Sequence, residues 1–107
     1  DNNFNPLNET QKKEFGELSA QIVKLIHSCS EKLKNNDYDS FKEDIRTSNT
    51  LNNQLSALKR EELQRIQNQG NSIKVSLVYL SMLQEAQNVV TYTINIMKVS
   101  MRFQLDE

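Results

Sequence analysis

The sequence has few of the residues that bend or cross-link a chain. It contains two glycines, one proline, one cysteine and no tryptophan among 107 residues. A chain with so few turn-forming residues must have few turns and long elements. The single cysteine, Cys29, cannot form an intramolecular disulfide, and with only His27 nearby there is no Cys and His set of zinc-binding size. These shortages exclude a disulfide-stabilised scaffold and a zinc finger, and they favour a reducing compartment.

Long apolar runs and an excess of charge are also missing. No stretch approaches the ~18 consecutive apolar residues that a membrane-spanning helix needs, and the start does not resemble a signal peptide. The 13 Lys and Arg nearly balance the 14 Asp and Glu, so there is no basic footprint for nucleic acid or a membrane surface. We therefore expect a soluble segment that inserts into no membrane and binds no nucleic acid. Its start at Asp1, without a methionine, indicates a piece of a longer protein.

Length and composition instead indicate one small helical domain. A chain of 107 residues can bury one modest core but not two independent ones. The hydrophobic share of 36% is low for a globular protein but usual for a helical bundle, in which each helix wets one side. We assign the whole chain, 1–107, to a single all-α domain with a polar tail at 1–5.

The first helix is expected over 6–34. Asn5 can cap the free amides of its first turn, and Pro6 fits that turn without losing a needed donor. Asn35, Asn36 and Asp37 favour a turn at its end, because their short polar side chains bond to the nearby backbone. Between these limits, apolar residues recur at three- and four-residue spacing along one arc, as in a half-buried helix. They are Phe15, Leu18, Ile22, Leu25, Ile26, Cys29 and Leu33.

Two further helices are expected over 38–69 and 72–105. Asp37 or Asp39 can cap the second helix. Gly70 can end it in a left-handed conformation, after which Ser72 can start the third. The second helix carries one apolar stripe, formed by Phe41, Ile45, Leu51, Leu55, Leu58, Leu63 and Ile66.

The three expected helices have matched lengths and short connections. Each spans about 45 to 50 Å at 1.5 Å per residue, and the turns between them are about two to four residues long. Neighbours joined in this way run antiparallel, which predicts an up-down-up three-helix bundle. On the second helix, the run from Lys59 to Glu62 mixes charges of both signs and is expected to face solvent.

The third helix has more apolar surface than a helix of a small bundle normally buries. Its polar residues fall within about 80° on a wheel of 100° per residue, which makes one stripe. This polar stripe is Gln84, Asn88, Thr91, Asn95, Lys98 and Arg102. One apolar side holds Val75, Val78, Met82, Val89, Ile96 and Phe103. The other apolar side holds Leu80, Leu83, Val90, Ile94, Met97 and Met101.

Two interpretations of this helix remain open. In one, it is central in its own bundle and its polar stripe faces solvent. In the other, part of its apolar surface contacts a second copy, another domain of the parent chain or a partner protein. We take the side that begins at Val75 and ends at Phe103 as the candidate interface. Periodicity does not decide which of the two apolar sides points inward.

A family resemblance is carried by three segments taken in order: KKEFGELSAQIVKLI, NNDYDSFKEDI and SLVYLSMLQEAQNVVTYTINI. Together they resemble one three-helix half of a PhoU-type domain, from Glu9 to Phe103. The ending, LVYLSMLQEAQN followed by MKVSMRFQ, is similar to the version of this domain at the cytoplasmic carboxyl end of bacterial sodium/phosphate cotransporters. The resemblance implies a regulatory domain at the cytoplasmic face of the inner membrane. Its implied partners are the transmembrane part of the parent chain, a second PhoU-like half, or a second copy in a homodimer.

The most specific family motif lies in the third helix and is degenerate here. The family typically reads Leu-Glu-Arg-x-x-Asp-His-x-x-Asn-Ile. The resemblance places residues of this chain at the family's Glu, Arg, Asp and Asn positions, in that order: Gln87, Asn88, Thr91 and Asn95. PhoU proteins hold metal clusters with acidic residues, whereas neutral amides and hydroxyls offer a hard cation less charge. Asn49 and Asn53, the counterparts on the second helix, are also neutral, so we expect no metal and no cofactor.

Three functions remain open, and none is catalytic. The first is a regulatory domain of a sodium-dependent phosphate transporter, acting in phosphate uptake through helix contacts. The second is a stand-alone metal-binding regulator of phosphate signalling, which Gln87 and Thr91 disfavour. The third is a helical oligomerisation or adaptor domain. We expect a solvated His27 and a buried Cys29 rather than catalytic groups, and we expect that the protein is not an enzyme.

Overall fold

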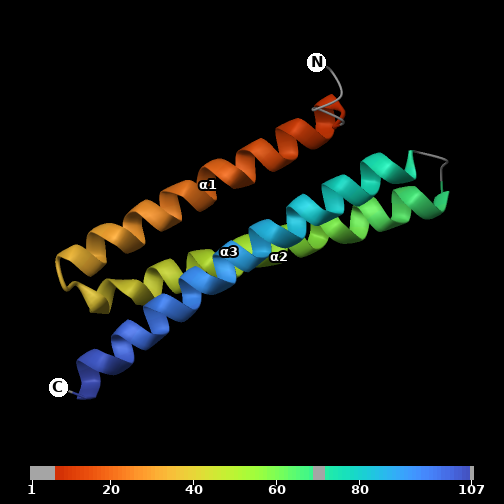
Figure 1. Cartoon of the computed structure of the whole chain (residues 1–107). Coiled ribbons are helices and arrows are strands. Elements are labelled where there is room, and N and C mark those ends of the chain that lie inside the picture. Colours follow the sequence, from red (N-terminus) through yellow and green to blue (C-terminus); the bar gives the residue numbers. More distant parts are fainter. Residues whose placement is uncertain (1–6, 69–71, 107) are drawn as a thin grey trace.

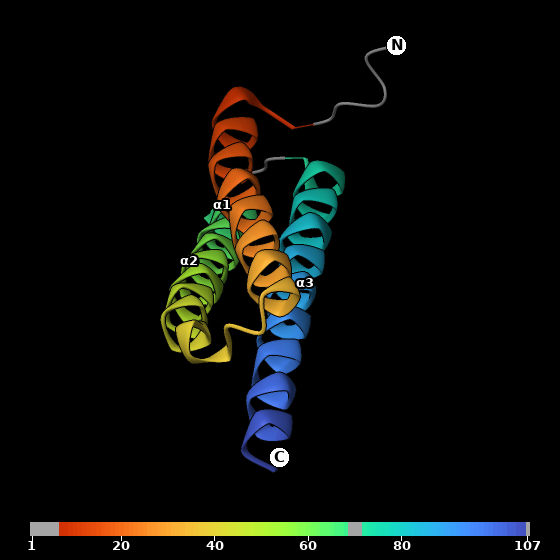
Figure 2. The ribbon, with the colours of Figure 1, turned by 90° about the vertical axis from the view of Figure 1, so that its left-hand side faces the viewer.

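The computed structural model describes residues 7–68 and 72–106, and every element in these ranges is helical. The elements are α1 (Glu9–Lys34), the 3-10 helix η2 (Tyr38–Ser40), α2 (Phe41–Asn68) and α3 (Ile73–Asp106). Figure 1 shows the three long helices side by side, and the turned view in Figure 2 shows α1 over the space between α2 and α3. The molecule is elongated, with extents of 56 × 29 × 15 Å. The prediction of an all-α fold with three long helices is confirmed.

Helix α1 begins with a capping box at Asn8. The Asn8 side chain accepts a hydrogen bond from the Gln11 amide at 2.8 Å, and the Gln11 side chain accepts one from the Asn8 amide at 3.0 Å. Two free donors of the first turn are satisfied reciprocally, so the helix starts efficiently at Glu9. The cap expected at Asn5 and Pro6 lies outside the described residues, but Leu7 and Asn8 are not helical, so the helix begins later than the expected residue 6.

The turn after α1 forms where the polar residues predicted it. Asn36 has a φ of 55°, a left-handed conformation that asparagine tolerates better than most residues. The amide of Asp37 donates to the carbonyl of Lys32 at 2.9 Å, and the amide of Asn36 donates to that of Leu33 at 3.3 Å. These two bonds close the helix end in the Schellman pattern.

The connection into α2 differs from the expected cap. The Asp37 carboxylate accepts a hydrogen bond from the Ser40 hydroxyl at 2.8 Å and caps no backbone amide, while Asp39 lies inside η2. The short 3-10 helix delivers the chain into α2, which therefore begins at Phe41 rather than near residue 38. The predicted end of this helix at Gly70 lies outside the described residues.

The core lies between the three helices. Helices α2 and α3 pack together more extensively than either packs against α1. The buried apolar residues are Leu18, Ile22, Leu25, Cys29, Phe41, Leu51, Leu55, Tyr79, Leu83, Val90, Ile94 and Met97. Cys29 is buried as expected, and burial raises the pKa of its thiol, with the Asp44 carboxylate adding to the effect. Two residues of the expected stripes, Ile26 and Leu63, are exposed instead, because each lies at the edge of its arc.

The buried face of α2 is apolar in the middle and acidic at each end. Residues spaced three and four apart share this face: Asp44, Ser48, Leu51, Leu55, Leu58 and Glu62. Glu62 has no exposed area, so the expectation that the whole run from Lys59 to Glu62 faces solvent was wrong. The cause is spacing, since Glu62 follows the buried Leu55 by two helical turns and points the same way.

The Glu62 carboxylate joins all three helices. It accepts hydrogen bonds from the Arg65 guanidinium of α2 at 2.7 Å, the Ser76 hydroxyl of α3 at 2.6 Å and the Gln11 amide group of α1 at 3.3 Å. A buried carboxylate is tolerated only with a cation and several donors around it, and these three groups provide them. Nearby, the Tyr79 hydroxyl donates to Glu14 at 2.9 Å. Burial, reinforced by this bond, raises the pKa of the Tyr79 phenol.

A second carboxylate holds the other end of α1. Asp44 of α2 accepts hydrogen bonds from Lys32 Nζ and from the Ser28 hydroxyl, each at 2.9 Å. The ion pair with Lys32 is largely shielded from solvent. Helix α1 is thus fixed to α2 by polar contacts near both of its ends, with apolar packing between them.

Replacing Glu62 tests how much the buried carboxylate contributes. We expect Glu62→Ala to lower the free energy of unfolding by about 3 kcal/mol, because Ser76 and Gln11 lose a buried acceptor and Arg65 loses its partner. The neighbouring Glu61 is more than half exposed and lies 3.9 Å from Arg65, so Glu61→Ala should change stability by less than about 0.5 kcal/mol. Urea unfolding of the two variants measures the difference. Equal effects would contradict the assigned role of Glu62.

Candidate functional site

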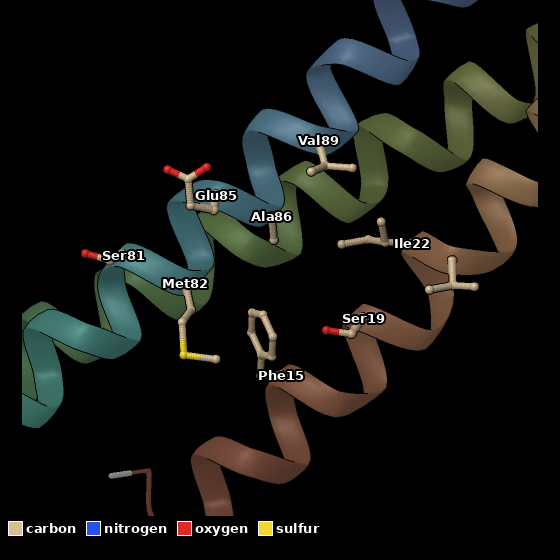
Figure 3. A pocket seen from close by; sticks show the side chains of 9 residues that line it. Phe15, Ser19, Ile22, Ser81, Met82, Glu85, Ala86 and Val89 are labelled. Carbon is tan, nitrogen blue, oxygen red and sulfur yellow. The ribbon is translucent and has the colours of Figure 1, made fainter. Parts of the chain in front are cut away.

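An apolar groove lies between α1 and α3 and encloses about 460 Å³. It is called the α1–α3 groove below. Figure 3 shows Phe15 and Met82 facing one another at one end, and Ile22 and Val89 toward the other. The full lining is Phe15, Ser19, Ile22, Val23, Ser81, Met82, Glu85, Ala86 and Val89.

The spacing of the lining residues explains why the groove forms. On each helix they recur at three- and four-residue intervals, so they stand on one side of α1 and one side of α3. Small side chains at Ser19 and Ala86 leave room between the larger residues that flank them. Because α1 packs less closely on α3 than α2 does, this room remains open to the outside.

The apolar surface continues along α3 beyond the groove. Val89, Ile96 and Phe103 are 41%, 46% and 65% exposed, and Tyr92 and Val99 are exposed beside them. A second, smaller hollow of about 350 Å³ lies on this continuation, lined by Tyr92, Asn95, Ile96, Val99, Ser100 and Phe103. We define the apolar face as the α1–α3 groove together with these five α3 residues. An apolar surface of this extent is unusual on a protein that contacts nothing.

The structure decides which apolar side of α3 points inward. Leu83, Val90 and Met97, from the other side, have no exposed area. The candidate interface residues lie on the outer side, where Val75, Val78 and Met82 are half-buried and Val89, Ile96 and Phe103 are exposed. Val23, Tyr92 and Val99 also belong to this surface and were missed in the sequence. The signal for Tyr92 and Val99 was their position, three residues after Val89 and Ile96 respectively.

Gln84 and Thr91 of the polar stripe, with the neighbouring Gln87, form a hydrogen-bonded seam between α3 and α2. Gln87 Nε2 donates to the Ser56 hydroxyl at 2.8 Å and to the Asn52 carbonyl at 3.1 Å. Asn52 Nδ2 contacts the Thr91 hydroxyl at 3.4 Å, and Lys59 Nζ donates to Gln84 Oε1 at 2.8 Å. Gln87 is half-buried in this seam, where an amide can donate hydrogen bonds without the desolvation that a carboxylate would suffer. This is a physical reason for a neutral side chain at this position. The buried Asn52 Oδ1 has no hydrogen-bond partner among the described residues.

The residues of the degenerate family motif do not all have the same surroundings. Gln87 is half-buried in the seam, and Thr91 contacts α2 at its exposed edge. Asn88 and Asn95 are exposed. Asn88 Oδ1 accepts a hydrogen bond from Gln84 Nε2 at 3.0 Å. Together Asn88, Thr91, Tyr92 and Asn95 line a shallow hollow of about 300 Å³. Over residues 7–68 and 72–106, no three His, Cys, Asp or Glu side chains gather as a metal ion would require.

The two residues considered for catalysis have different surroundings. His27 is exposed on α1, and Cys29 lies in the core. They do not face a common site.

Comparisons with protein families, curated proteins and solved structures find no match for this chain. The resemblance to a PhoU-type domain therefore stays a prediction. In the part of the chain that the structure describes, no helix is long and apolar enough to cross a membrane.

Two adjacent valines test which side of α3 is internal. Val89→Asp should keep the helical fold and change the free energy of unfolding by less than about 1 kcal/mol, because residue 89 reaches solvent. Val90→Asp places an unpaired charge in the core and should lower it by about 3 kcal/mol or more. Circular dichroism and urea unfolding measure both. If Val89→Asp unfolds the protein and Val90→Asp does not, the inward and outward sides of α3 are assigned the wrong way round.

Proposed function

We propose that this chain is a non-catalytic interaction domain that binds a partner protein through the apolar face of α1 and α3. The observation that carries the proposal is the apolar groove lined by Phe15 and Met82, together with the exposed apolar residues that follow it along α3 to Phe103. Burying apolar surface contributes about 25 cal/mol per Å², so a partner that covers this face gains a large driving force. Surfaces of this kind mark interaction sites in helical proteins.

The polar groups inside the domain support a role by contact. Glu62 joins α2 to α1 and α3 through Gln11 and Ser76, and Asp44 joins α2 to α1 through Lys32. Their hydrogen bonds are directed inward, and they hold α1 in the position that forms one wall of the groove. The interior thus provides a rigid support for a binding surface.

The narrower form of the proposal is a regulatory domain of a sodium-dependent phosphate transporter, at the cytoplasmic face of the inner membrane. Its support is the resemblance of residues 9–103 to one PhoU half, with which three long helices agree. The antiparallel up-down-up order belongs to this proposal. It is supported by the meeting of Gln11, Glu62 and Ser76 at one end and of Lys32 and Asp44 at the other. The partner would be the transmembrane part of the parent chain or a second PhoU-like half.

The exposed apolar face also supports a second candidate, a helical oligomerisation domain. In that case the surface is covered by another copy of the chain. The two candidates predict different masses in solution, because only the second requires the isolated chain to self-associate through this face.

Phosphate uptake tests the proposed function. The double variant Val89→Asp/Ile96→Asp would be introduced into the protein that contains this chain, in cells with no other sodium-dependent phosphate transporter. We expect it to change uptake as strongly as deletion of residues 1–107, because both remove the contact. Leu63→Asp replaces an exposed apolar residue of α2 outside the apolar face and should leave uptake unchanged.

Two results would count against this account. If deletion changes uptake and the double variant does not, the apolar face is not the functional surface. If deletion itself leaves uptake unchanged, the link to phosphate transport is wrong. Circular dichroism of the purified double variant confirms that it remains folded.

A further inference from the structure

We infer that the occupant of the α1–α3 groove is an amphipathic helix of a partner protein, with a lysine or arginine beside its apolar stripe that pairs with Glu85. This inference rests on the proposed function, since it names the chemistry of the partner that the apolar face binds.

The walls of the groove favour a helix over an extended peptide as the occupant. Both walls are α-helices, whose backbone donors and acceptors are bonded internally. An extended peptide would therefore find no backbone partners in the groove, whereas a helix brings its own backbone bonds with it. The apolar face runs from Met82 to Phe103, which is about 32 Å at 1.5 Å per residue. This length matches a docked helix of about six turns.

The sizes of the lining residues suit the same occupant. Ser19 and Ala86 are small and stand between larger neighbours on each wall. Side chains of a helix placed along the groove can enter the spaces over these small residues, as ridges enter grooves in helix packing. A docked helix would complete a four-helix arrangement around Phe15, Met82 and Val89.

The charge of the groove lining favours a helix that carries a basic residue. Glu85 is the one charged residue among those lining the groove, and it stands at the rim on the α3 side (Figure 3). Among the described residues it forms no ion pair with a cation of its own chain. A docked helix would reduce the access of water to this carboxylate, so a cation placed opposite it is favoured and an acid is disfavoured.

A second copy of this chain fits the charge poorly. Parallel pairing of two α3 helices about a twofold axis would place Glu85 opposite its own equivalent, which is repulsive. On α3, Lys98 and Arg102 point about 100 to 140° away from Glu85. Lys74 shares its direction, but it lies eleven residues earlier, about 16 Å along the helix. Antiparallel pairing of Lys74 with Glu85 would centre the contact near Tyr79 and leave Phe103 uncovered.

A membrane surface fits the charge poorly as well. Bacterial inner-leaflet lipids that carry charge are anionic, and a carboxylate beside the inserting apolar residues would be repelled. The helical partner with a basic residue is thus the occupant that satisfies both the apolar lining and Glu85.

Three synthetic helical peptides test this inference by fluorescence anisotropy with the purified chain. Each has about three heptads with a leucine stripe. The first carries a lysine beside the stripe, the second has glutamate at that position, and the third has the composition of the first in scrambled order. We expect the lysine peptide to bind about tenfold more tightly than the glutamate peptide, and the scrambled peptide to bind far more weakly.

Variants of the chain serve as matched controls. Glu85→Lys should reverse the order of the lysine and glutamate peptides. Glu17→Lys makes the same charge change on an exposed α1 residue outside the groove lining and should keep the original order. Val89→Asp should weaken binding of both peptides.

Several outcomes overturn the inference. Equal binding of the lysine and glutamate peptides, or an order that Glu85→Lys does not change, would show that Glu85 does not choose the occupant. Absence of peptide binding would show that the groove takes no helix. Self-association abolished by Val89→Asp would assign the face to a second copy, and vesicle binding abolished by the same change would assign it to lipid. Failure of the proposed function is distinguishable from these outcomes, because it appears as phosphate uptake that is unchanged by the substitutions at Val89 and Ile96.

Discussion

The arrangement of this domain depends on one buried carboxylate. Glu62 accepts hydrogen bonds from α1, α2 and α3 at a single point, and its charge is balanced by Arg65. At the opposite end, Asp44 binds Lys32 and Ser28 of α1. Helix α1 is therefore held against α2 near both ends, and its distance from α3 is set by these contacts. The α1–α3 groove is the space that this arrangement leaves, so the position of the candidate site follows from charges outside it.

Helix α3 serves three surfaces at once. Leu83, Val90 and Met97 face the core, the residues of the seam bond to α2, and the remaining side forms most of the apolar face. Gln84, Gln87 and Thr91 belong to the second of these surfaces, where Gln87 donates to the Asn52 carbonyl and the Ser56 hydroxyl. The core of this small domain buries one apolar side of α3, and the other side is available for a partner. The two apolar sides therefore do not require a large core. In the proposed function, a partner that covers this side accounts for the exposure of its apolar side chains.

Much of the fold could be predicted from periodicity, and specific parts could not. The spacing of Leu18, Ile22 and Leu25 defined the buried arc of α1, and the asparagines after Lys34 marked the turn. The inward side of α3 was not predictable, because both of its apolar sides repeat with the same period and only the neighbouring helices distinguish them. Glu62 was missed because charge in a mixed run normally indicates solvent. Its spacing from Leu55 was the available signal, but its burial depends on donors from Gln11 and Ser76, far away in sequence.

The central claim is that the apolar face is open on the isolated chain and covered in the complete assembly. Thiol alkylation of an Ile96→Cys variant measures this directly, with the buried Cys29 as a slow internal reference. The account predicts rapid alkylation of the new cysteine in the purified chain and strong protection of it in intact cells that contain the parent protein. Equally rapid alkylation in both settings would show that nothing covers the face and would contradict the account.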